Sequence, residues 1–174
     1  MAAEARMRRT RSKTHEASAV GRTDRRIQEH ENDAYGLRGK LPEPTACPDC
    51  GATYRNGRWT WDPAPADASR TSCPACRRIK DGVPAGVVTI EGAFAAAHRA
   101  EVENLARNVE EREKRDHALK RIITIGEEGD ALRISTTDGK LARSIADALH
   151  SAYQGDLDYQ FTERENVFRA RWSR

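Results

Sequence analysis

The sequence predicts an α+β protein in which a small cysteine-rich unit precedes a β-β-α-β-β domain. Two observations predict this fold class. All four cysteines fall between Cys47 and Cys76, and the chain from residue 119 onward alternates short strand patterns with one strong helical pattern. We expect four segments: a tail and linker at 1–46, the cysteine-rich unit at 47–82, a strand and a long connecting helix at 83–118, and the β-β-α-β-β domain at 119–174.

The cysteines form two pairs with the spacing of metal ligands. Cys47 and Cys50 are separated by two residues, as are Cys73 and Cys76, and 22 residues lie between the pairs. This spacing lets two tight turns present four thiolates to one tetrahedral Zn²⁺ ion. Between the pairs, Asn56-Gly57 is a strong hairpin signal flanked by strand patterns at 53–55 and 58–61. We therefore expect a four-cysteine zinc ribbon with structural zinc, because four thiolates leave no open coordination position.

Two disulfides or a redox-active pair are the alternatives for the same cysteines. Disulfides require an oxidising compartment, whereas the arginine-rich N-terminus has no apolar segment typical of a secretory signal. A redox C-x-x-C motif normally occurs once, after a strand, and not twice around a hairpin. No apolar run approaches the roughly 18 residues of a membrane span. We expect a cytoplasmic protein, bacterial by its alanine and arginine content, with reduced thiols and no membrane association.

The tail is basic at its start and has almost no apolar content. Five cations lie within eight residues: Arg6, Arg8, Arg9, Arg11 and Lys13. Such a segment buries too little surface to offset its chain entropy, so we expect disorder in the free protein. It is either a solvated tail or a basic arm that orders on nucleic-acid phosphates, and the second is favoured.

Further candidate phosphate contacts come from the folded part. Arg77, Arg78 and Lys80 follow the second cysteine pair, and Lys140 and Arg143 lie at the start of the helix expected at 139–153. Cations at a helix N-terminus are unfavourable for the helix alone and are compatible with an anionic partner. For the first group, ordinary solvated charge is an equal alternative. For the second, Asp138 as the N-cap residue explains the start of the helix equally well without an anionic partner.

The remaining elements follow from hydrophobic periodicity. We expect strands at 87–90, 121–125, 132–136, 157–161 and 167–172, and helices at 93–116 and 139–153. The helix at 93–116 carries a narrow apolar face and is expected to cover part of a four-stranded sheet formed by the last four strands. Trp59 and Trp61 are two positions apart and so share one face of the hairpin. For both, packing against a neighbouring element is favoured over a base-stacking role.

Catalytic motifs are missing from the chain. It has no phosphate-binding loop, no dinucleotide fingerprint, no nucleophile elbow and no H-E-x-x-H pair. Its carboxylates lie mainly in charged helical stretches, where they are typical of a solvated face. We expect that the protein is not an enzyme.

Several stretches carry a family resemblance. They are the Cys-Pro-x-Cys-Gly turn, Gly57-Arg58-Trp59, residues 98–108, 119–125 and 136–142, and Arg171-Trp172. Together they resemble small bacterial zinc-ribbon proteins, and more distantly the amino-terminal part of the large-ribosomal-subunit export adaptor of eukaryotes and its archaeal relatives. The resemblance implies a noncatalytic binding protein associated with ribosomes or RNA. Together with the basic arm, the resemblance favours structured RNA as the partner. The alternative is a protein–protein adaptor that uses the ribbon as its docking surface. The net charge of only +3 suits this adaptor role.

Overall fold

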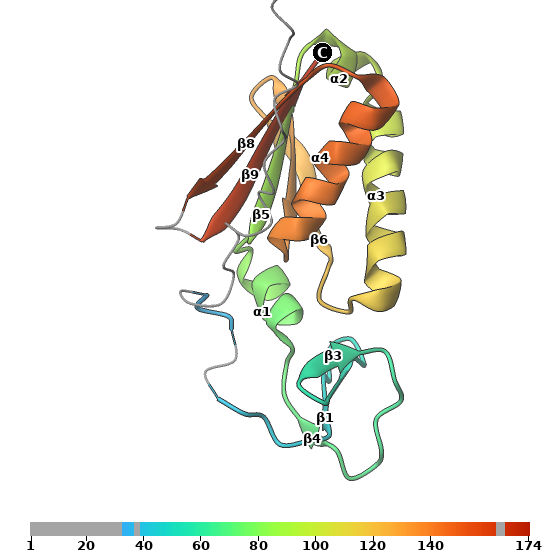
Figure 1. The fold of residues 1–174 in the computed structure, drawn as a ribbon, viewed down its shortest axis with the longest axis vertical. Helices are drawn as coiled ribbons and strands as arrows, with labels where there is room; N and C mark the ends of the chain where they lie inside the picture. The colour runs from blue at the N-terminus through green and yellow to red at the C-terminus, as the bar shows by residue number, and fades with distance from the viewer. Residues whose placement is uncertain (1–32, 37–38, 163–165) are drawn as a thin grey trace, which may run out of the picture.

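The computed structural model describes residues 33–36, 39–162 and 166–174. They form two units: a small four-stranded ribbon, and a larger unit in which helices cover one face of a five-stranded sheet (Figure 1). A short helix, α1 (Pro74–Asp81), connects them. This arrangement confirms the α+β class and the four clustered cysteines. No helix within these ranges has both the length and the apolar character that crossing a membrane requires.

The ribbon is built from four very short strands. They are β1 (Thr45–Ala46), β2 (Thr53–Arg55), β3 (Arg58–Thr60) and β4 (Ser69–Arg70), in the order β3-β2-β1-β4. The predicted hairpin is β2 with β3, and its turn residues Asn56 and Gly57 have φ values of 52° and 75°. Positive φ at both positions is what a two-residue type I′ turn requires. Strand β1 belongs to a stretch that we expected to be linker, so the ribbon begins two residues before its first cysteine.

The sheet of the larger unit has one strand more than the sequence pattern predicts. Its strands are β5 (Gly86–Glu91), β6 (Ile122–Glu128), β7 (Ala131–Thr136), β8 (Asp156–Thr162) and β9 (Val167–Ser173), in the order β6-β7-β5-β9-β8. β5 lies at the centre, antiparallel to β7 and parallel to β9. The four-stranded sheet expected from the sequence is thus incomplete, because β5 is the central strand. Pairing between β5 and β9 joins residues about 80 positions apart, which local patterns do not reveal.

The helices lie on one face of this sheet (Figure 1). α4 (Gly139–Tyr153) packs on β5 and β9, and its buried residues, such as Leu141 and Ile145, meet Val88 and Trp172 in the core. The single helix expected at 93–116 is divided into α2 (Ala93–Ala97) and α3 (Arg99–Asp116). The division at His98 lets α2 contact β5 and β7 while α3 packs on α4 and β6.

Candidate metal centre

The four cysteine sulfurs converge on one point in the ribbon. Their Sγ atoms all lie within 4.8 Å of one another, and those of Cys50 and Cys73 are 3.8 Å apart. A tetrahedral ion with metal–sulfur bonds of about 2.3 Å separates its sulfurs by about 3.8 Å. All four cysteines are free thiols, so the two-disulfide alternative does not describe this structure. The geometry and the donor type fit one metal ion held by four sulfurs.

Local backbone structure places the first pair. The Cys47 N–H donates to the Ala52 carbonyl oxygen at 2.8 Å, and the Gly51 N–H donates to the Cys47 carbonyl oxygen at 2.9 Å. Gly51 has a φ of 79°, a conformation that glycine adopts without a steric cost. The turn after β1 thus directs two thiols, Cys47 and Cys50, toward the same side.

The second pair belongs to the start of α1, where the sequence pattern predicted no helix. Cys73 is the N-cap residue, and its Sγ accepts from the Cys76 N–H at 3.4 Å. Pro74 occupies the first turn, and Gly82 ends the helix with a φ of 66°. Proline at the start and glycine just past the end are the sequence signals that would have predicted this helix. The Cys73 N–H also donates to the Cys47 Sγ at 3.3 Å, which ties the two pairs together.

A buried arginine from the larger unit completes the site. The guanidinium of Arg121 donates to the sulfurs of Cys50 at 3.0 Å, Cys76 at 3.2 Å and Cys73 at 3.6 Å. From the sequence, Arg121 was expected only to begin a strand and had no assigned role. No motif links it to cysteines 45 or more positions earlier in the chain, so only the tertiary structure brings them together.

The thiols of the site differ in acidity. Burial raises the pKa of Cys73, and it raises that of Cys76 to about 11 despite the Arg121 hydrogen bond. Burial acts in the same direction on Cys50, but the Ala52 backbone and the Arg121 guanidinium outweigh it and lower the Cys50 pKa to about 7. Burial opposes the charge on Arg121 as well, yet its hydrogen bonds to the Cys50 and Cys76 sulfurs raise its pKa. The site therefore holds the charged Arg121 guanidinium beside Cys50, the thiol whose pKa is lowered.

The two tryptophans of the hairpin region differ in burial. Trp59 is buried against Tyr54, with ring centroids 5.5 Å apart. Trp61 follows β3 and is 37% exposed, but its indole N–H donates to the Lys114 carbonyl oxygen of α3 at 2.6 Å. The favoured packing interpretation is thus right for Trp59, and Trp61 joins the ribbon to the larger unit.

The predicted basic residues that the structure describes lie on two helices, α1 and α4. Those of the arm (Arg6, Arg8, Arg9, Arg11 and Lys13) lie outside the described residues. Lys80 and Lys140 are exposed, at the end of α1 and the start of α4. Arg143 is half-buried, with its Nε 3.7 Å from an Asp147 carboxylate oxygen and its guanidinium over the Tyr159 ring.

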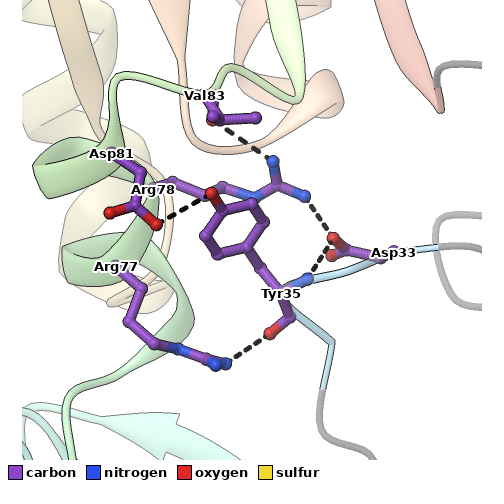
Figure 2. A network of polar contacts seen from close by, with 6 residues as sticks. All are labelled: Asp33, Tyr35, Arg77, Arg78, Asp81 and Val83. Carbon is purple, nitrogen blue, oxygen red and sulfur yellow. Dashed lines mark hydrogen bonds and ion pairs between the residues drawn. The ribbon is translucent and has the colours of Figure 1, made fainter.

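Arg77 and Arg78 hold a segment of the chain that precedes the ribbon. Figure 2 shows the Arg78 guanidinium between the Asp33 carboxylate, with which it forms an ion pair, and the Val83 carbonyl oxygen. The Tyr35 ring lies 4.6 Å from the Arg78 guanidinium carbon, and the Tyr35 carbonyl oxygen accepts from Arg77 at 2.6 Å. Arg78 is only 6% exposed. In this conformation these two arginines bind the chain itself, so Arg78 is not open to a phosphate.

Comparison of the chain with models of known families, with curated proteins and with solved structures found no match. Function is therefore inferred from the metal centre.

Proposed function

We propose that this is a noncatalytic cytoplasmic zinc protein in which Cys47, Cys50, Cys73 and Cys76 hold one structural Zn²⁺ ion. The observation that carries the proposal is the convergence of four sulfurs within 4.8 Å. Four thiolate ligands are typical of zinc and fill its tetrahedral coordination, which leaves no position for a reacting water or substrate. The ion would then stabilise the ribbon without taking part in a reaction.

Metal analysis of the purified protein tests this proposal. We expect one zinc per chain by elemental analysis and four thiols that become titratable only after a chelator removes the metal. Co²⁺ substitution should give the thiolate charge-transfer and tetrahedral d–d absorption bands of a four-sulfur site. Absence of stoichiometric metal from protein prepared without chelator, together with failure to bind added Zn²⁺, would refute it.

For the partner, we propose structured RNA, with ribosomal RNA as the first candidate. The support is the cluster of five cations between Arg6 and Lys13 and two exposed lysines, Lys80 and Lys140, on the folded part. Lysine and arginine contacts to phosphates release counterions and give affinity that needs no particular base sequence. Because Arg78 is buried against Asp33, this proposal depends mainly on the arm.

A triple substitution in the arm tests the RNA proposal. We expect Arg8→Gln, Arg9→Gln and Arg11→Gln together to weaken binding to ribosomal RNA and to reduce the slope of log affinity against log salt by about 2–3. The matched control is the triple change of Arg107, Arg112 and Arg115 to Gln, which removes equal charge from exposed positions on α3. Equal loss in both variants would indicate nonspecific attraction, and absence of the wild type from ribosomal fractions at low salt would count against the ribosome.

One observation favours a protein partner as the second candidate. Ile79, in the last turn of α1, and Val83, just after the helix, are 39% and 41% exposed. Exposed apolar side chains that close together in sequence suit a small protein contact. Capture of one protein by the wild type but not by an Ile79→Glu variant, after nuclease treatment, would favour the adaptor over RNA binding.

A further inference from the structure

Arg121 is a buried cation whose anionic partners are the cysteine sulfurs. One terminal guanidinium nitrogen, Nη2, donates to the sulfurs of Cys50 and Cys73, and the other, Nη1, donates to that of Cys76. The Nε–H donates to the Ala118 carbonyl oxygen at 3.0 Å. Only 8% of Arg121 is exposed. Within the described ranges, no carboxylate forms an ion pair with it. A buried charge is costly unless it is paired, so the sulfurs must supply the compensating charge.

The charge of the loaded site makes this pairing reciprocal. Four thiolates and one Zn²⁺ carry a formal charge of about −2, which is itself unfavourable in a buried position. The Arg121 guanidinium reduces this to roughly −1 and donates to three of the four ligands. Charge-assisted hydrogen bonds of this kind orient metal ligands and stabilise their charged form.

The same arginine is anchored in the larger unit. The Arg121 backbone N–H donates to the Thr137 Oγ1 at 2.9 Å, and the Thr137 N–H donates to the Arg121 carbonyl oxygen at 2.9 Å. Ala118 and Leu119, from the loop between α3 and β6, pack into the apolar cluster of the ribbon. The ring of Trp61 lies 5.5 Å from the guanidinium carbon. The loop at 117–121 therefore belongs to both units.

We propose that Arg121 is a positioning residue for the metal site and that it couples metal binding to the docking of the ribbon on the 117–121 loop. This inference rests on the proposed metal binding and goes beyond it. The metal fixes the sulfurs at one point, and three of these sulfurs hold the buried guanidinium. Loss of the metal then lets the sulfurs move apart, which withdraws the acceptors of Arg121 and releases the ribbon from the larger unit, in addition to loosening the ribbon itself.

Metal affinity is the first test. We expect Arg121→Met, which keeps the side-chain length but not the charge or donors, to lower Zn²⁺ affinity about 10- to 100-fold in a chelator competition. The matched control is Arg133→Met, which removes an arginine that bonds Glu128 on the same sheet and should leave the affinity unchanged. Arg121→Lys keeps the charge and should recover part of the loss. An Arg121→Met affinity within about twofold of the wild type, or no recovery by Arg121→Lys, would overturn the proposal.

Hydrogen exchange of the wild type is the second test and needs no variant. We expect metal removal to raise amide exchange at 117–122 by roughly tenfold or more, while amides in the middle of α4 keep their protection. In zinc-loaded Arg121→Met the same loop should already exchange fast. Unchanged protection of residues 117–122 after metal removal would refute the coupling, even if the Arg121→Met protein could not be purified.

The two proposals fail in different ways. If the wild type binds no Zn²⁺, the proposed function is wrong. If it binds one Zn²⁺ and both tests of Arg121 are negative, the site is metal-binding and only the coupling is wrong.

Discussion

Replacing Cys73 by serine separates metal binding from helix capping. Cys73 is fully buried, its Sγ is 3.8 Å from that of Cys50, and it accepts the Cys76 N–H as the N-cap of α1. Serine is a preferred N-cap residue but a poor zinc ligand, so Cys73→Ser retains the cap and removes one thiolate. Structural zinc supplies about 10–16 kcal/mol, or roughly 2.5–4 kcal/mol per thiolate. We therefore expect Cys73→Ser to weaken Zn²⁺ binding by roughly 10²–10³-fold.

The assay is competition for Zn²⁺ against a chelator of known affinity at fixed pH, with metal content measured on the same samples. Cys73→Ala is the paired variant, because it also removes the cap and should cost about 1 kcal/mol more stability than Cys73→Ser. Wild-type affinity in Cys73→Ser, with one zinc still bound per chain, would show that the four sulfurs do not act as one ligand set and would refute the reasoning.

Two further predictions concern the larger unit. The Lys120 ion pair, at 2.7 Å, holds the pKa of Glu113 below its usual range, so the pair stabilises the fold above the unfolded pKa of about 4.3 and stops doing so as pH falls through the lower folded pKa. Glu113→Gln should thus cost about 0.5–1 kcal/mol at pH 7 and nothing once Glu113 is protonated, as measured by denaturant unfolding; a cost that does not change with pH would contradict this. A Cβ on Gly86 would lie 2.6 Å from the Ala142 Cβ of α4, so Gly86→Ala should destabilise by about 1–3 kcal/mol, whereas Gly126→Ala, whose Cβ meets nothing within 4 Å, should not. Equal thermal stability of the two alanine variants would contradict the close packing of α4 on β5.

Local chemistry in the sequence predicted most of the individual elements. Asn56-Gly57 set the hairpin because both of its residues adopt positive φ readily. Asp138 predicted the start of α4, and its carboxylate accepts the Leu141 N–H at 2.9 Å. The cysteine spacing predicted a single four-sulfur cluster, which the structure contains. These signals act within a few residues, so they can be recognised without knowledge of the fold.

Tertiary structure decided what surrounds those elements. The central place of β5, the burial of Arg78 against Asp33 and the position of Arg121 beside three cysteines all depend on contacts between residues far apart in sequence. In the sequence an arginine is equally suited to a solvated surface, a phosphate or a buried anion. Only the fold sets the desolvation and the partners that distinguish these roles, because the free energy of a charged group depends on its surroundings. The chain thus determined by itself that four thiols would meet, and the fold determined which cation meets them.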